Sequence, residues 1–191
     1  PTSSYAQAAA YAMGRAMDDV IISAATGTAF TGETGSGTET AQTAIAANVG
    51  STTGLNIDKL LKAKEKFDLA SVDPSIQRYI VVGPEQMSNL LGTTQVTSSD
   101  FNSVKALVQG EVDTFLGFKF ITSNRLAKAG NDRTCIAFAQ DGITLAVGKD
   151  VSARIDERAD KSYATQVYYC MSIGATRMEK EKVIGITCTE A

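Results

Sequence analysis

The sequence predicts an α+β fold in which helices come first and a long antiparallel sheet follows. Three observations carry this prediction. Residues 4–24 repeat alanine and apolar side chains at spacings of three and four, which is the period of one helix face. After Gly110 the period changes to two, as in strands. Residues 165–175 then alternate over an unusually long stretch, so we expect a long sheet that one helix has to cover.

The predicted first helix covers residues 4–24 and ends near Gly27. A helix of this length spans roughly 30 Å. Its many alanines allow another element to approach closely, and we expect the stripe to be core rather than a ligand site. The stripe consists of Tyr5, Ala8, Ala9, Ala12, Met13, Ala16, Met17, Val20 and Ile21.

A loop and a second helix follow. Residues 26–54 are rich in Gly, Thr and Ala, which predicts a loop, with one short strand near residues 43–47. Asn56 has a side chain that commonly caps helices, and apolar residues recur on one side of the segment behind it. We therefore expect a helix over residues 57–67.

The centre of the chain predicts one strand and two short helices. The apolar run 79–82 reads as a buried strand. Pro84 suits the first turn of a helix, which we expect to end at Gly92. Asp100 is expected to cap a further short helix that ends at Gly110.

The second half predicts two hairpins. One joins residues 112–115 to 118–121 through Leu116 and Gly117, and we expect a positive φ at Gly117. The other is expected at Asp141-Gly142, a strong hairpin turn signal. Its strands would be residues 134–138 and 143–147. Further strands are predicted at residues 151–155, 165–175 and 183–188.

Composition limits the function classes. Of 191 residues, 43% are hydrophobic and 20% are charged, which suits a globular protein. The 18 basic and 21 acidic side chains give a net charge of −3, which argues against a dedicated nucleic-acid binder. No run approaches the roughly 18 consecutive apolar residues of a membrane helix, so no membrane contact is expected.

The chain contains no histidine, and this absence limits its possible chemistry more than any other feature of the sequence. The absence removes Ser-His-Asp and Cys-His catalysis and the His-containing zinc sites. Cys135, Cys170 and Cys188 are odd in number and widely spaced, which is neither a disulfide framework nor a metal-ligand pattern. We therefore predict no enzyme, no catalytic residue, no cofactor and no metal site.

One glycine-rich segment invites a nucleotide-binding interpretation. Residues 32–38 resemble a phosphate loop but lack the Gly-Lys-Ser/Thr ending whose lysine would reach the phosphates. A flexible loop is the better interpretation. A nucleotide-binding enzyme is kept as an alternative function.

A cluster of mixed charge follows the predicted strand at residues 151–155. Paired carboxylates there could do acid–base work, but charges of alternating sign at a strand end more often form salt bridges. Salt bridges between subunits would set their register. The cluster comprises Arg154, Asp156, Glu157, Arg158, Asp160 and Lys161, and its candidates for subunit contact are Arg154, Asp156, Glu157 and Arg158.

Several stretches, in order over nearly the whole chain, resemble major capsid proteins of tailed bacteriophages. The first is residues 4–19 with the Gly-Thr-Ala at 27–29, and the second is residues 116–126. The strand-to-helix passage at 79–86 and the late segment 164–167 are similar to that family as well. Arg125, in the second stretch, is a further candidate for subunit contact.

The resemblance implies the phage capsid fold, also called the Johnson fold. In that fold a long spine helix lies on a long antiparallel sheet, next to a mixed axial domain. The spine helix would be residues 4–24. Residues 1–56 and 151–191 would form the peripheral domain, and residues 57–150 the axial domain.

The resemblance also implies a structural function. The chain would be a major capsid protein subunit that self-assembles, as pentamers and hexamers of copies of itself, into an icosahedral head shell. The shell would enclose double-stranded DNA without binding it specifically, and would be assembled in the bacterial host cytoplasm. Scaffold, portal and decoration proteins are the other partners implied, and the virion is the implied location. The nearest alternative is an encapsulin-type compartment shell protein, which shares the fold.

The start of the chain departs from the family pattern. In the family, an N-terminal arm and an extended β-loop precede the spine helix, whereas residue 4 already begins the predicted helix. We expect the chain to be the C-terminal body of a longer capsid protein. Such a body is expected to fold alone but to assemble poorly.

Overall fold

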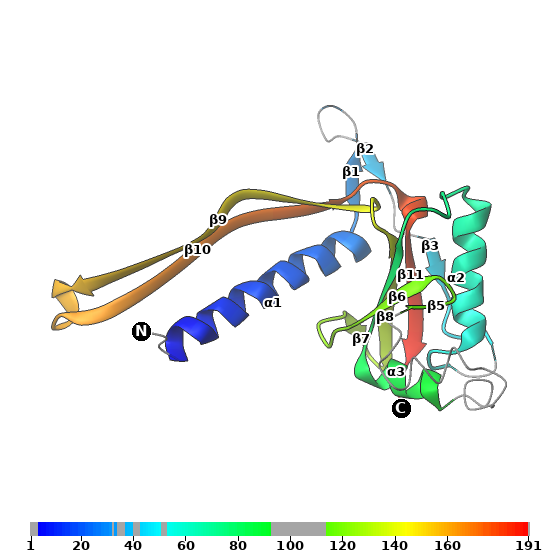
Figure 1. The fold of residues 1–191 in the computed structure, drawn as a ribbon, viewed down its shortest axis with the longest axis horizontal. Helices are drawn as coiled ribbons and strands as arrows, with labels where there is room; N and C mark the ends of the chain where they lie inside the picture. The colour runs from blue at the N-terminus through cyan, green and yellow to red at the C-terminus, as the bar shows by residue number, and fades with distance from the viewer. Residues whose placement is uncertain are drawn as a thin grey trace.

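The computed structural model describes residues 4–31, 33, 37–39, 43–50, 53–92 and 114–190. The chain forms a compact body and a long projection that extends from it (Figure 1). The helix predicted after Asp100 lies outside the described residues.

A mixed seven-stranded sheet forms the body, with the strand order β3-β11-β8-β4-β6-β5 and β7 paired to β8. The pairs β3–β11 and β4–β6 are parallel and the other pairs are antiparallel. In this order the strands are β3 (Thr43–Ile45), β11 (Val183–Thr189), β8 (Asp132–Ala139), β4 (Arg78–Val82), β6 (Phe118–Thr122), β5 (Thr114–Phe115) and β7 (Lys128–Ala129).

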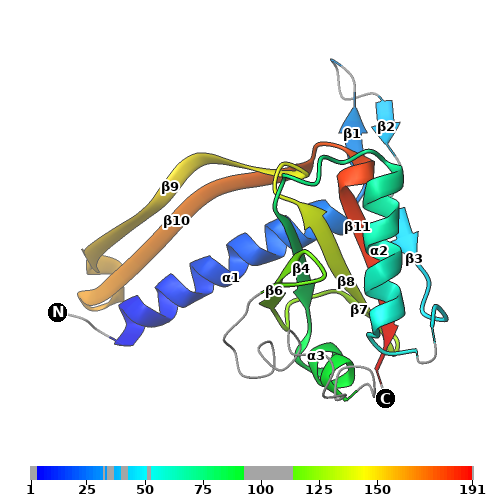
Figure 2. The ribbon, with the colours of Figure 1, turned by 45° about the vertical axis from the view of Figure 1, so that its right-hand side comes forward.

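Helix α2 (Ile57–Leu69) covers one face of this sheet (Figure 2). Asn56 caps it as predicted, because its side-chain oxygen accepts a hydrogen bond from the Lys59 amide at 2.8 Å. Leu60 and Phe67 are fully buried, and the Phe67 ring lies 6.1 Å from that of Phe118 on β6. This face therefore carries most of the core.

A shorter helix, α3 (Pro84–Leu91), follows β4 directly, with Pro84 in its first turn and Gly92 after its end. Both boundaries were predicted and are confirmed. A proline has no amide hydrogen to lose at the first helical position, and its φ already suits a helix.

The spine helix α1 (Ser4–Thr26) leaves the body and runs outward. Only Ile22 and Ala25, near its end, are buried. The predicted stripe is therefore core only in part: Met13 and Met17 are half-buried, whereas Tyr5 remains 79% exposed.

The projection, which we call the arm, consists of β9 (Ile143–Arg158) and β10 (Ala164–Arg177), paired antiparallel as an isolated two-stranded sheet. Helix α1 runs along its inner side (Figure 1). A short 3-10 turn, η1 (Ala159–Lys161), closes the tip, and Ser162 and Tyr163 behind it have φ of 53° and 59°. Three further short elements are β1 (Ala29–Thr31) and β2 (Gly37–Glu39), which pair with each other, and η2 (Lys180–Lys182).

The hairpin predicted at Asp141-Gly142 is wrong. A tight turn is present, since the Gly142 amide donates to the Ala139 carbonyl at 2.8 Å. However, β8 pairs with β4 and β11, whereas β9 leaves the body and pairs with β10. The two segments predicted at residues 143–147 and 151–155 are one continuous strand.

The predicted domain boundary at residue 150 falls inside β9. Strand β11, part of the residues 151–191 that the sequence assigns to the peripheral domain, lies between β3 and β8 in the sheet of the body. Its placement follows from seven consecutive antiparallel pairs with β8, from Val183 opposite Phe138 to Thr189 opposite Asp132. No helix among the described residues is long and apolar enough to cross a membrane.

The turn at Leu116-Gly117 is confirmed, and it yields a stability prediction. The two residues have φ of 53° and 86°, both in the left-handed region, as a type I′ hairpin turn requires. Gly117→Val is expected to lower the free energy of unfolding by about 1–2 kcal/mol, because a side chain at positive φ is strained. Urea denaturation checks this. Gly174→Ala on β10 is the control, since Gly174 has comparable open space but no positive φ. Equal effects of the two changes would contradict the turn assignment.

Candidate subunit-contact surfaces

The outer end of the arm carries large apolar side chains that no other part of the described chain covers. Ile155 is 69% exposed and Tyr163 71%. Val167, directly opposite Ile155, is also exposed, so the two form an apolar pair on one face. Both outer edges of a two-stranded sheet have unpaired backbone groups, and such a sheet is marginal by itself. The end of the arm therefore has the properties of a contact surface.

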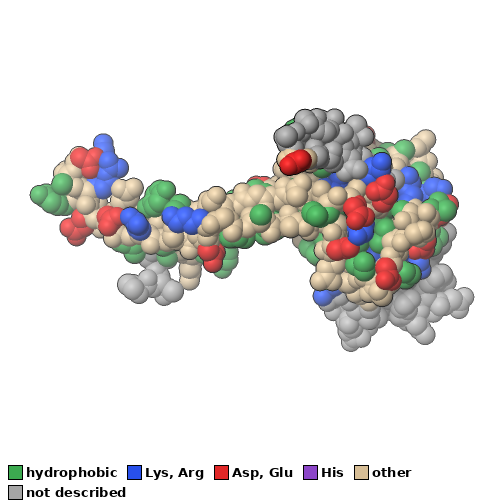
Figure 3. Space-filling model, turned by 90° about the horizontal axis from the view of Figure 1, so that it is seen from above, with side chains coloured by type: hydrophobic (Ala, Val, Ile, Leu, Met, Phe, Trp, Pro, Cys, Tyr) green, Lys and Arg blue, Asp and Glu red, His purple; other side chains and the backbone are tan. Residues whose placement is uncertain are grey.

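Charged residues flank Ile155 along β9. Arg154, Asp156, Glu157 and Arg158 are all exposed near the end of β9. Because successive side chains of a strand alternate between its two faces, Glu157 shares the face of Ile155, and the other three lie on the opposite face. Figure 3 shows charged and hydrophobic side chains gathered at the far end of the projection. The Arg158 Nε donates to Asp160 Oδ1 at 2.8 Å, and this bond lowers the pKa of Asp160. At least this ion pair of the cluster is internal to one chain.

Arg125 lies elsewhere. It follows β6 on the body, and its Nε donates to Asp19 Oδ1 of α1 at 2.7 Å. This hydrogen bond is the main cause that lowers the pKa of Asp19 and raises that of Arg125. The observed contact of Arg125 is thus within the chain, and its role between subunits stays a prediction.

Helix α1 has a second, buried attachment at Arg177, the last residue of β10. Arg177 is 3% exposed, and its Nη1 donates to the carbonyls of Ala25 and Gly27, both at 3.1 Å. The last carbonyls of a helix have no partner within the helix and carry its negative end, so a cation there is favourable. Arg177 therefore fixes the end of the spine helix to the base of the arm.

Two more buried charges organise the body. Lys59 is fully buried, and its Nζ donates to the carbonyls of Thr53 at 2.7 Å, Gly54 at 2.8 Å and Thr187 at 3.1 Å. Burial lowers the pKa of this ammonium. The three donors are each satisfied, so Lys59 ties the loop before α2 to strand β11.

Glu190, just after β11, forms the other cluster. Its carboxylate accepts a hydrogen bond from Gln86 at 3.0 Å and forms ion pairs with Arg133 and Lys128. The hydrogen bonds from Gln86, Lys128 and Arg133 lower the pKa of Glu190 from 4.5 to about 2. The cluster connects α3 and β8 to the end of the last strand.

Sequence reasoning missed Lys59, Arg177 and Glu190 as organising residues. Asn56 three positions earlier marked the start of α2, but nothing marked Lys59 as buried, because its partners are backbone carbonyls.

Cys135 and Cys188 are buried and Cys170 is half-buried, and all three are free thiols. No metal-binding group of His, Cys, Asp or Glu occurs in the described part of the chain. Most of the glycine-rich loop, residues 32 and 34–36, lies outside that part.

Comparison with known proteins decides the family. A family model described as phage capsid protein matches residues 1–190. The chain belongs to this phage capsid protein family. A search of curated proteins finds no match.

Solved phage capsids share the fold of this capsid protein. The structure from Mycobacterium phage Che8 is 20% identical, with a TM-score of 0.64 over 96% of this chain and 63% of that one. The capsid of cyanophage P-SCSP1u is 19% identical, with a TM-score of 0.70 over 100% of this chain and 67% of that one. A virus-like particle from Pyrococcus furiosus is 15% identical, with a TM-score of 0.51 over 76% of this chain and 56% of that one. The predicted α+β phage capsid fold is confirmed, and the chain spans less than two thirds of the Che8 chain.

The two attachments of α1 predict unequal losses. Arg177→Met is expected to lower the free energy of unfolding by about 3 kcal/mol, because two carbonyls lose bonds to a buried charge. Arg125→Met is the matched control, and its loss should be much smaller, since its pair with Asp19 is nearly half exposed. Urea denaturation measures both. A loss for Arg125→Met as large as that for Arg177→Met would contradict the assigned anchor.

Glu190 predicts a pH dependence. Its pKa is lower in the folded state, so its contribution to stability is present above about pH 4.5 and is lost as the pH falls towards about 2. Between about pH 6 and about pH 3, wild type should lose more stability than Glu190→Gln, which has no carboxylate to protonate. Urea midpoints across this range check it. Parallel curves for the two proteins would show that the cluster does not stabilise the fold.

Proposed function

We propose that this chain is the shell-forming part of a major capsid protein, and that copies of it assemble into the icosahedral head that encloses phage DNA. The observation that supports it most is the end of the arm, where the apolar residues Ile155, Tyr163 and Val167 are exposed and charged residues are close by in the chain. Membership of the phage capsid family supports the same function. The work of the protein is geometric, and no chemical step is assigned to it.

The arm and the body would occupy different positions in the shell. Helix α1 and the arm, residues 143–177, form the peripheral part, and the seven-stranded body forms the axial part that faces the symmetry axes of pentamers and hexamers. Head-to-tail contacts of this kind form rings when the rotation between copies closes. Each single contact can be weak, because many are made at once.

The charges at the end of the arm would set the register between neighbouring copies. Arg154, Asp156, Glu157 and Arg158 carry two positive and two negative charges, so a neighbour of the same sequence offers complementary partners. Arg125, bonded to Asp19 across the outside of the body, would contribute at a separate contact.

The remaining partners follow from the shell. The net charge of −3 fits a wall that encloses double-stranded DNA without specific binding. Scaffold, portal and decoration proteins would meet the shell during assembly in the host cytoplasm, and the mature location would be the virion. The family model favours this function over a compartment shell protein, although the Pyrococcus furiosus particle shares the fold.

The end of the arm provides the test. Ile155→Asp should abolish concentration-dependent association of the purified chain, because it places a charge in an apolar contact. Its thermal melting should stay unchanged, since Ile155 is 69% exposed in the single chain. Sedimentation velocity and electron microscopy read the assembly state.

The control is Ser88→Asp, which adds the same charge at an exposed position on α3. Wild type and Ser88→Asp should associate alike. Association of Ile155→Asp at the wild-type concentration would contradict a contact at the end of the arm. A monomeric wild type at every concentration would contradict self-assembly of this chain.

A further inference from the structure

A cavity of about 330 Å³ opens on the side of the body between α2, the loop before β4 and the turn of β5 and β6. Its lining brings together two cations, Lys64 and Arg78, and one carboxylate, Asp68. The rest of the wall comes from residues 74–77, Leu116 and Gly117. The charged groups of the lining therefore sum to one excess positive charge.

Arg78 is held rigidly in this wall. Its side chain is 7% exposed, its Nη2 donates to Asp68 Oδ1 at 2.8 Å and to the Val72 carbonyl at 3.2 Å, and its guanidinium stands 5.1 Å from the Phe67 ring centroid. The same group retains donors that a ligand can reach, because both printed hydrogen bonds use Nη2 and its Nη1 has no hydrogen-bond partner among the described residues. A charged donor in a mostly buried side chain gains from a ligand that supplies an acceptor.

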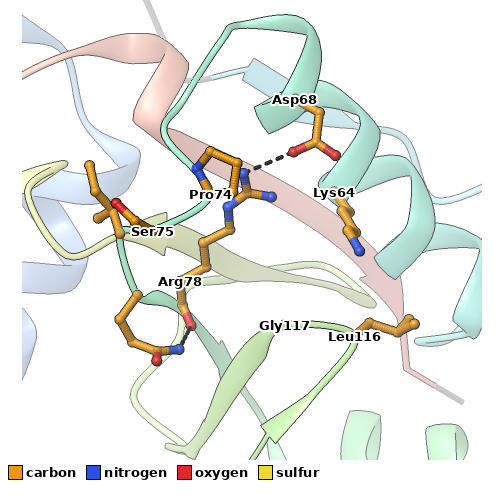
Figure 4. A pocket seen from close by; sticks show the side chains of 9 residues that line it. Lys64, Asp68, Pro74, Ser75, Arg78, Leu116 and Gly117 are labelled. Carbon is orange, nitrogen blue, oxygen red and sulfur yellow. Dashed lines mark hydrogen bonds and ion pairs between the residues drawn. The ribbon is translucent and has the colours of Figure 1, made fainter.

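Lys64 provides the second charge. It stands on the exposed side of α2 and makes no ion pair with any residue that the structure describes. Figure 4 shows the Lys64 and Arg78 side chains reaching from α2 and β4 into the same space, with Leu116 and Gly117 on the adjoining wall. One cation is fixed and the other is free to close on a ligand.

We propose that this cavity binds a small oxyanion, a free phosphate or carboxylate group. The oxyanion would meet a planar guanidinium that still has a donor to offer, and the Lys64 ammonium would approach it from the opposite side. Asp68 neutralises only part of the charge of Arg78, since it is half exposed to water. The site uses none of the arm residues, so its test does not depend on the proposed contact at the end of the arm.

The test measures thermal melting of the whole chain at constant ionic strength with sodium phosphate, sodium acetate or sodium chloride. Phosphate should raise the melting temperature saturably, and chloride should not. Lys64→Gln should weaken the apparent affinity about tenfold, the loss expected for one charge-assisted hydrogen bond. Lys66→Gln is the matched control, because Lys66 lies on the same helix outside the lining. Lys64 is chosen over Arg78 because it is exposed and its loss leaves the core intact.

The outcomes separate cleanly. A saturable effect of phosphate that Lys64→Gln weakens and Lys66→Gln does not supports the site. An equal effect of acetate supports it with a carboxylate as ligand, and an effect of phosphate alone supports it with a phosphate. Equal shifts with chloride, equal responses of the two variants, or no shift with either oxyanion would overturn it.

Discussion

The buried guanidinium of Arg177 is the contact on which the architecture depends. Arg177 is the last residue of β10 and pairs with Ile143, the first residue of the arm. Its guanidinium donates hydrogen bonds to the carbonyls of Ala25 and Gly27 and so holds the end of α1. Met178, the next residue, donates to the Gly142 carbonyl at 3.0 Å in the turn that leads back to β8. The spine helix, the arm and the body thus meet at one side chain. A charge buried this deeply is tolerated because carbonyl dipoles replace the water it lost.

Buried charged side chains also join separate segments in the body. Lys59 donates to three backbone carbonyls, and Glu190 accepts from side chains on α3, β7 and β8. In each case a charged side chain joins segments that are distant in sequence, where a hydrophobic contact would not fix direction. Hydrogen bonds to charged groups are directional and stronger than neutral ones. These groups therefore fix how the loops and strand ends sit around a core that is otherwise apolar.

The arm, in contrast, has few stabilising contacts of its own. It has one helix along its inner side and only two strands, and its outer end exposes Ile155 and Tyr163. A lone two-stranded ribbon gains little from its own contacts, so its stability depends on α1 and, in the proposed shell, on neighbouring copies. A stable body combined with an arm whose apolar side chains are uncovered suits a subunit that assembles with its neighbours.

The sequence by itself determined the elements with local causes. The period of three to four set α1, Asn56 and Pro84 set the starts of α2 and α3, and Leu116-Gly117 set a turn, because caps and turns depend on neighbours in the chain. Only the tertiary structure decided which strands pair. Asp141-Gly142 makes the expected turn, yet β8 and β9 enter different sheets, since β8 gains two partners in the body. The deep burial of Lys59 and Arg177 was equally invisible, because their partners are backbone carbonyls that have no identity in the sequence. Arg125 was separated from the other four contact candidates for the same reason: long-range pairing with Asp19 is a property of the fold.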